Sequence, residues 1–184
     1  MLSIFKRTEL IPVVNNDKKY RTKHNPIGQL FNKTKPKQIN LYFGGQFNQR
    51  KLKKLRDLGI TTIVNMRSQS VLPDMALEEF KYFHLPTPDN HPPSLDMLIE
   101  GAEFIDNEIR MGGKVYINCL KGRGRGPTMA IAYLIKAGRT FDDAHRLITN
   151  LKPDICISHL QLRMLQELEN YYKESVDESN CIRS

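Results

Sequence analysis

Residues 115–135, VYINCLKGRGRGPTMAIAYLI, constrain the fold more than any other stretch of the chain. A β-branched and aromatic run ends at a cysteine and leads into a loop with three glycines and two arginines. An apolar segment follows at once, and it predicts a helix over 127–137 that begins with Pro127 at its first position and stops at Gly138. A strand that feeds a helix through a tight loop is a building unit of α/β proteins.

The remaining sequence repeats this alternation of strands and helices. The four prolines in 86–94 exclude regular structure there, and Ser94 is a suitable N-cap for the helix that follows. Thr140 can cap a further helix with Asp143 as its partner, and SHLQ at Ser158 is a capping box. We therefore predict an α/β fold with a central, mostly parallel sheet flanked by helices on both faces. The predicted strands are 39–45, 60–66, 81–85 and 114–118, and the predicted helices are 49–58, 73–80, 95–111, 127–137, one from about 140 and one from 158.

Charge divides the chain of 184 residues into parts. Residues 1–37 hold nine Lys and Arg against two acidic residues, so most of the net charge of +8 lies there. We expect a basic, flexible arm over 1–37, a single domain over 38–174 and a tail over 175–184. Such an arm favours weak contact with an anionic surface of lipid or nucleic acid, or with an acidic protein face.

The cysteines and apolar runs indicate the compartment. Cys119, Cys156 and Cys181 are odd in number and form no Cys-x-x-Cys pair, which argues against a disulfide framework and a zinc site. No apolar run is long enough for a transmembrane segment, and the N-terminus lacks the continuous apolar core of a secretory signal. We expect a cytoplasmic, reducing location, with no metal or other cofactor.

The loop after residue 118 has the features of an anion-binding site. Its backbone N–H groups and the N-terminus of the next helix present partial positive charge to a bound anion. It lacks the Gly-Lys-Ser/Thr ending of nucleotide-binding P-loops. We expect a phosphate group to be held by Leu120, Lys121, Gly122, Arg123, Gly124 and Arg125.

Cys119 lies at the end of the predicted strand, at the floor of this loop. The surrounding N–H dipoles and arginines favour its thiolate, which is the nucleophilic form of a cysteine. Arg125 can hold two non-bridging oxygens of a phosphate in a bidentate contact. A buried structural cysteine is the alternative interpretation, and the basic, glycine-rich surroundings argue against it.

Cys119 to Arg125 fits the Cys-x5-Arg signature of protein tyrosine phosphatases. Gly122 and the following Pro-Thr resemble the dual-specificity branch of that superfamily, as do NLYFGGQ, LKKLRDLGITTIVNMRS and LPTPDNHPPS, which occur in the same order upstream. The resemblance covers roughly residues 38 to 172. It implies a phosphatase that works through a phosphocysteine intermediate, with Cys119 as nucleophile and Arg125 as phosphate ligand.

Hydrolysis of a phosphate ester also needs a proton for the departing oxygen. The resemblance makes Asp89 the general acid, and then the base for the attacking water. A turn aspartate that bonds its own backbone is the alternative interpretation. His91 and Asp74 rank below Asp89 as acids, and Asp96 fits better as a first-turn helix acid.

Two positions depart from the family pattern. Asn118 stands where a histidine usually precedes the cysteine, and an amide carries no charge. Gly126 stands where a serine or threonine usually follows the arginine and donates a hydrogen bond to the sulfur. Losing that donor predicts a slower second step, by about ten- to a hundredfold.

The substrate remains open at the level of sequence. The family resemblance and the absence of large insertions favour proteins carrying phosphotyrosine, phosphoserine or phosphothreonine. Lys121 and Arg123 add cations that suit a polyanion such as a phosphoinositide or an RNA 5′-phosphate. A third hypothesis is a catalytically weak module that binds phosphate and releases it unchanged, which Asn118 and Gly126 favour.

Overall fold

One five-stranded sheet organises the protein, in the order β1-β2-β5-β3-β4. The structure is a computed structural model that describes residues 11–15, 37–69 and 79–181. Strands β2, β5, β3 and β4 are parallel, and β1 pairs antiparallel with β2 at one edge. The predicted mostly parallel sheet is therefore confirmed. The strands are β1 (Ile11–Asn15), β2 (Lys37–Gly44), β3 (Thr62–Arg67), β4 (Lys81–Thr87) and β5 (Val115–Asn118).

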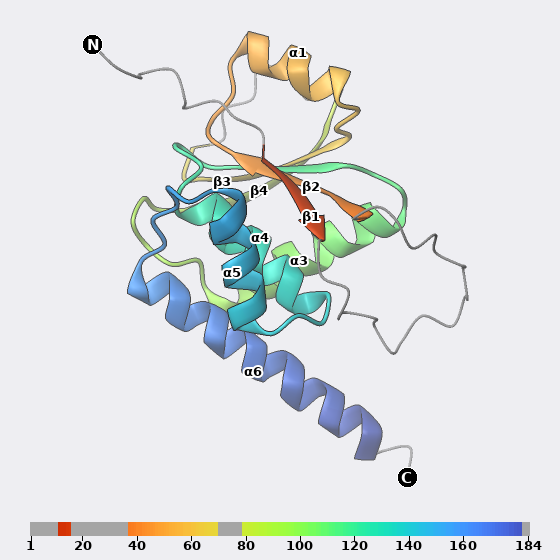
Figure 1. The fold of residues 1–184 in the computed structure, drawn as a ribbon, viewed down its shortest axis with the longest axis vertical. Helices are drawn as coiled ribbons and strands as arrows, with labels where there is room; N and C mark the ends of the chain where they lie inside the picture. The colour runs from red at the N-terminus through yellow and green to blue at the C-terminus, as the bar shows by residue number, and fades with distance from the viewer. Residues whose placement is uncertain (1–10, 16–36, 70–78, 182–184) are drawn as a thin grey trace.

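Helices cover both faces of the sheet, as predicted. Figure 1 shows α1 on one face and α3, α4, α5 and α6 on the other, with α6 extending away from the domain towards the C-terminus. The helices are α1 (Gln49–Asp57), α3 (Leu95–Arg110), α4 (Arg125–Lys136), α5 (Phe141–Leu151) and α6 (His159–Cys181).

The side chains of the central strand β5 alternate between two hydrophobic clusters. Val115 and Ile117 belong to the larger cluster under the four helices, whereas Tyr116 belongs to the smaller cluster under α1. Successive side chains of a strand point to opposite faces, so one apolar strand supplies both cores. Helix α4 packs at the centre of the larger cluster and is buried from Arg125 to Ile135. The strand and helix that flank the cysteine loop are thus the most buried elements of the domain.

The predicted helix caps are present. Ser94 and Thr140 each accept a hydrogen bond from the backbone N–H three residues on, at 3.2 and 3.3 Å. At the start of α6, Ser158 Oγ accepts from the Gln161 N–H at 3.3 Å, and Gln161 Oε1 accepts from the Ser158 N–H at 3.0 Å. This reciprocal pair is a capping box, which satisfies donors that a helix N-terminus leaves without partners.

The start of α4 differs from the prediction. The helix begins at Arg125, with Gly124 as its N-cap, so Pro127 is the third helical residue rather than the first. The N–H groups of a first helical turn have no acceptor within the helix, so a proline costs little there. The earlier start places Arg125 itself on the helix, where its backbone is fixed.

The folded domain extends beyond both of the boundaries predicted from the sequence. Five residues assigned to the arm form β1, and Val13 within them is fully buried. Helix α6 continues through Cys181, past residue 174, where the domain was expected to end. The helix predicted over 73–80 lies outside the described residues, except for its last two positions. In the described ranges, no helix is long and apolar enough to cross a membrane.

Candidate active site

The cysteine loop begins one residue after β5 and runs into α4. Cys119 is therefore the first residue beyond the strand rather than its last, and only 3% of it is exposed. The Gly122 N–H donates a hydrogen bond to its Sγ at 3.2 Å. The sulfur thus lies within hydrogen-bonding distance of a backbone amide of the loop.

A glycine turn at the end of β2 supports this loop from behind. The Cys119 N–H donates to the Gly44 carbonyl at 3.2 Å, and Gly45 forms an isolated bridge with Lys121. Gly122 has a positive φ of 67°, and a Cβ there would come within 2.4 Å of the Gly44 backbone. No other residue fits this position, because it requires both a left-handed backbone and close packing against the turn.

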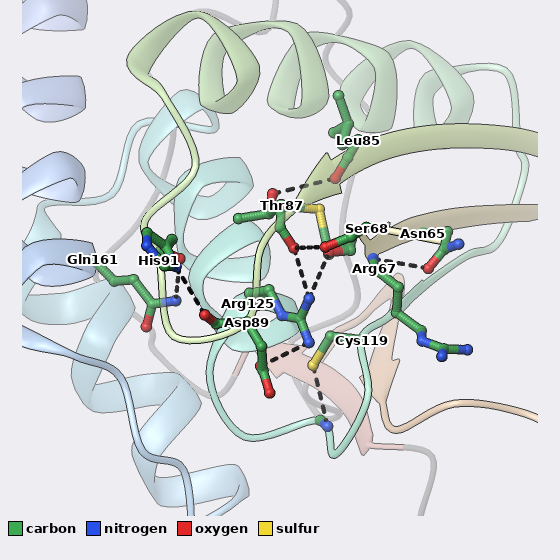
Figure 2. A network of polar contacts seen from close by, with 12 residues as sticks. Asn65, Arg67, Ser68, Leu85, Thr87, Asp89, His91, Cys119, Arg125 and Gln161 are labelled. Carbon is green, nitrogen blue, oxygen red and sulfur yellow. Dashed lines mark hydrogen bonds and ion pairs between the residues drawn. The ribbon is translucent and has the colours of Figure 1, made fainter. Parts of the chain in front are cut away.

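Arg125 is held by carbonyl groups at the ends of β3 and β4. Its side chain is 5% exposed, and its Nη1 donates to the Thr87 carbonyl at 2.7 Å and to the Met66 carbonyl at 3.4 Å. Figure 2 shows the guanidinium between these strand ends and the cysteine sulfur. The other nitrogen, Nη2, forms an ion pair with Asp89 Oδ1 at 2.8 Å. The arginine is thus fixed on one side and offers donors on the other.

Asp89 lies on the irregular segment between β4 and α3, and its side chain is 59% exposed. The segment is anchored to α6, because Gln161 Nε2 donates to the His91 carbonyl at 3.2 Å. Asp89 and Cys119 line the same cavity, whereas the exposed His91 does not. Asp96 occupies the first turn of α3, where the helix dipole favours it. Asp74 lies outside the described residues.

The cavity that joins these groups has a volume of about 250 Å³. Most of the phosphate-loop residues predicted from the sequence line it, and Gly122 instead packs behind the loop. Sequence reasoning missed the contribution of α6 and the segment before it, although the capping box at Ser158 marked that helix end. The lining residues are Asp89, Asn90, Cys119, Leu120, Lys121, Arg123, Gly124, Arg125, Cys156, Ser158 and Gln161.

The two extra cations of the loop have different surroundings. Arg123 Nε donates to the Asp154 carbonyl at 2.7 Å and lies 3.7 Å from the Asp154 carboxylate. A hydrogen bond from Lys152, together with its charge and that of Arg123, lowers the pKa of Asp154 below its usual value. Lys121 is exposed at the cavity. Arg123 is therefore partly neutralised by a local partner, and Lys121 is the better placed of the two to meet a ligand.

The two positions that depart from the family pattern both lie against the cysteine loop. Asn118 Nδ2 donates to Asn65 Oδ1 at 3.0 Å, while the buried Asn118 Oδ1 has no hydrogen-bond partner among the described residues. A Cβ added at Gly126 would lie 3.6 Å from Cys119 Sγ. Thr128, two residues on, donates to the Gly124 carbonyl at 3.0 Å instead of to the sulfur.

Comparison with known proteins shows which family has this sequence and fold. A family model described as "Dual specificity phosphatase, catalytic domain" matches residues 41–171. The chain belongs to this family. Mouse dual specificity protein phosphatase 8 is 31% identical over 136 residues, which cover 73% of this chain and 20% of that protein. The chain thus corresponds to about a fifth of the length of that phosphatase.

Solved structures agree with the family assignment. The active form of Tk-PTP is 25% identical with a TM-score of 0.65, covering 71% of this chain and 91% of that one. PTPMT1 in complex with PI(5)P is 23% identical with a TM-score of 0.68, covering 74% of this chain and 94% of that one. The sheet and helices are therefore those of the phosphatase fold. In the part of the chain that the structure describes, no group of three or more His, Cys, Asp or Glu residues is arranged to hold a metal ion.

Proposed function

We propose that this protein hydrolyses phosphate monoesters through a phosphocysteine intermediate. The observation that carries the proposal is the convergence on one cavity of the Cys119 sulfur, the loop amides, the Arg125 guanidinium and the Asp89 carboxylate. A nucleophile, an oxyanion cradle and an acid are the three parts that displacement at phosphorus requires. They come from two segments, the loop from Cys119 to Arg125 and the segment of Asp89 between β4 and α3, which the fold brings to one cavity.

In the first step, the Cys119 thiolate attacks phosphorus as the bond to the leaving oxygen breaks. Arg125 Nη2 and the loop N–H groups hold the equatorial oxygens, where charge spreads in the transition state. A bound phosphate takes over the guanidinium donors that Asp89 occupies in this structure. The Asp89 carboxyl group then gives its proton to the leaving oxygen, which departs as an alcohol or phenol.

In the second step, Asp89 accepts a proton from water as the water oxygen bonds to phosphorus. The phosphorus–sulfur bond breaks, and phosphate and the Cys119 thiolate are released. The Gly122 N–H stabilises the departing sulfur, since it donates to Sγ at 3.2 Å. The neighbouring hydroxyl donor is missing because residue 126 is glycine. We propose that this step limits the rate.

We further propose that the substrates are proteins phosphorylated on tyrosine, serine or threonine. The family match and the name of the mouse protein, a dual specificity protein phosphatase, support this class. A phosphoinositide or an RNA 5′-phosphate is the second candidate. Lys121 and the PI(5)P ligand of PTPMT1 favour it, while the contacts of Arg123 with Asp154 weaken the positive field that it needs.

A module that binds phosphate without hydrolysis is the third candidate. Asn118 and Gly126 favour it, because each removes a group that assists the cysteine chemistry in the family pattern. The retained Cys119, Arg125 and Asp89 oppose it, since binding alone needs neither a reactive thiol nor an acid. The enzyme is therefore the stronger proposal.

The proposed setting is the reducing cytoplasm, because the mechanism needs Cys119 as a thiol.

We also retain the proposal that the chain consists of an arm, a catalytic domain and a tail, and that the basic residues of 1–37 attract an anionic surface. Sedimentation with anionic and neutral vesicles, and with single-stranded RNA, tests that attraction. Binding only at low salt supports it, and the absence of binding at any salt concentration rejects it.

The decisive experiment for the function compares substrates under one set of conditions. Peptides carrying phosphotyrosine, phosphoserine or phosphothreonine, a phosphoinositide and a 5′-phosphorylated RNA are each incubated with wild type and Cys119→Ser. We expect the highest kcat/KM on the phosphopeptides and no turnover by the variant. Preference for the lipid or the RNA selects the second candidate. Binding without turnover by the folded wild type selects the third.

A further inference from the structure

Lys51 is a buried lysine behind the phosphate-binding loop, and the mechanism above does not use it. It lies on α1, which covers the face of the sheet opposite α3, α4, α5 and α6 (Figure 1), and only 4% of it is exposed. Its Nζ donates to the Gly45 carbonyl at 2.8 Å and lies 5.0 Å from the centre of the Tyr116 ring. The next two lysines of the same helix, Lys53 and Lys54, are exposed.

The carbonyl that Lys51 contacts belongs to the turn that supports Cys119. Gly44 accepts from the Cys119 N–H, Gly45 bridges to Lys121, and Gly122 packs directly on both glycines. Lys51 therefore bonds directly to the turn of Gly44 and Gly45, and this turn bonds to the cysteine loop. Lys51 does not line the cavity.

Local structure gives little reason for a buried ammonium at this place. The Gly45 carbonyl also accepts a hydrogen bond from the Tyr116 hydroxyl at 2.5 Å, so it has a partner without the lysine. Among the described residues, no carboxylate lies within ion-pairing distance of Lys51. An unpaired buried charge is costly, and such groups are enriched at functional sites.

The electrostatic environment connects Lys51 to the sulfur. Burial and the neighbouring Lys54 lower the pKa of Lys51 to about 8, while the negative charge of Cys119 acts in the opposite direction. Tyr116, the other titratable group against it, is neutral, because burial raises its pKa well above 10. Lys121 also carries a charge and pairs through its backbone with Gly45, but its side chain is exposed to solvent. Of the two charges that act on Lys51, those of Lys54 and Cys119, that of Cys119 is the negative one.

We propose that Lys51 is a positioning residue of this active site: it fixes the glycine turn behind the loop and supplies a buried positive charge that favours the Cys119 thiolate. The position before the cysteine, where the family pattern has a histidine, holds the neutral Asn118. Lys51 thus provides, from α1, a positive charge that the neutral Asn118 cannot carry. The proposal rests on the proposed thiolate chemistry of Cys119.

Alkylation of Cys119 by iodoacetamide tests this charge without requiring turnover. Peptide mass spectrometry separates the Cys119 product from those of Cys156 and Cys181 in the full chain. We expect Lys51→Met to alkylate about tenfold more slowly than wild type at pH 6, where the wild-type lysine is charged. The two proteins should converge at pH 9.5, where the wild-type lysine is also neutral.

Matched variants separate this role from simple packing. Lys53→Met removes the same charge from an exposed position of the same helix, and it should alkylate like wild type. Lys51→Arg keeps the charge and should retain most of the rate at pH 6. Equal rates for Lys51→Met and wild type at pH 6 would overturn the proposal. A loss of the same size at both pH values would also overturn it, because it would indicate a distorted loop.

Two further outcomes are distinguishable. If Lys51→Met does not fold, Lys51→Gln takes its place, and the same convergence between pH 6 and pH 9.5 is expected. If wild type alkylates as described but hydrolyses no phosphate ester, the proposed function fails while the role of Lys51 stands.

Discussion

At the scale of single residues, the chemistry of the site depends on what lies within reach of one sulfur atom. The Gly122 N–H donates to Cys119 Sγ, and Gly126 places no side chain beside it, although a Cβ there would make only ordinary contacts. The hydroxyl of Thr128, two residues on, donates to the Gly124 carbonyl instead of to the sulfur. In the described ranges, the sulfur therefore has no side-chain donor that would make it a better leaving group in the second step.

Gly126→Ser should restore this donor. A Cβ at this position would have no contact shorter than 3.6 Å, so the side chain fits without displacing a neighbour. We expect hydrolysis of the phosphocysteine to become about ten- to a hundredfold faster, as the hydrogen bond stabilises the departing thiolate. Gly126→Ala is the control, because it fills the same space without a hydroxyl. Equal steady-state rates for the two variants would show that the donor is not limiting.

Lys51→Met should stabilise the fold while it slows the chemistry. The pKa of Lys51 falls from 10.5 to about 8, so the unfolded chain holds this proton more tightly than the folded one. The buried charge therefore destabilises the protein below pH 8, and this penalty disappears as the pH rises towards 10.5. We expect a gain of about 2 kcal/mol at pH 7 after allowance for the lost hydrogen bond.

Urea denaturation at pH 7 and at pH 10 measures this gain. The advantage of the variant should be fully present at pH 7 and mostly lost at pH 10. A variant that is less stable than wild type at pH 7 would show that Lys51 is a net stabilising contact, contrary to this account.

At the scale of secondary structure, the ends of elements bring the site together. The carboxyl ends of β3 and β4 supply carbonyls for Arg125, and the loop between β5 and α4 supplies the amide that bonds the sulfur. Figure 2 shows how Gln161, near the start of α6, reaches the segment that carries Asp89. The capping residue of one helix thus also fixes the position of the acid.

Gln161→Ala should impair the acid more than the nucleophile. It removes the bond from Nε2 to the His91 carbonyl, which tethers the segment of Asp89 to α6. We expect kcat to fall about tenfold for alkyl phosphates, which need a proton on the leaving oxygen, and less for activated aryl phosphates. Thr140→Ala removes a comparable cap from α5 and should leave both rates unchanged. Equal losses on both substrates would point to a general structural defect.

The sequence indicated most of these elements because their signals are local. Caps at Ser94, Thr140 and Ser158 depend on residues three positions apart, and the strands depend on runs of apolar residues. The start of α4 was misplaced because proline is tolerated throughout a first helical turn. The roles of Lys51 and Gln161 were missed, since each depends on a contact between segments far apart in the chain.

At the scale of the whole molecule, part of the basic arm belongs to the folded domain. Its residues Ile11–Asn15 add an antiparallel strand to an otherwise parallel sheet, and Val13 lies in the larger core cluster. Composition predicted an arm here because the surrounding residues are charged and polar. A strand of only five residues, stabilised by pairing with β2, has too short an apolar pattern to be predicted from such a sequence.

Val13→Ala tests whether this strand belongs to the folded domain. The side chain is fully buried, so its truncation should lower the free energy of unfolding by about 2 kcal/mol. Urea denaturation measures the change, and hydrolysis of an aryl phosphate should be unaffected because the site lies elsewhere. A variant as stable as wild type would show that residues 11–15 do not pack against the domain and belong to the flexible arm.

The proposed mechanism requires that Cys119 forms a covalent bond to phosphorus during turnover. Its most direct test is a rapid-mixing experiment with an aryl phosphate, in which release of the aryl alcohol is followed from the first turnover and the quenched protein is examined for phosphocysteine. We predict a burst of about one equivalent, phosphate on Cys119, a slower steady state, and neither burst nor turnover in Cys119→Ser. Turnover that persists in Cys119→Ser, or wild-type turnover without any phosphocysteine, would contradict the account.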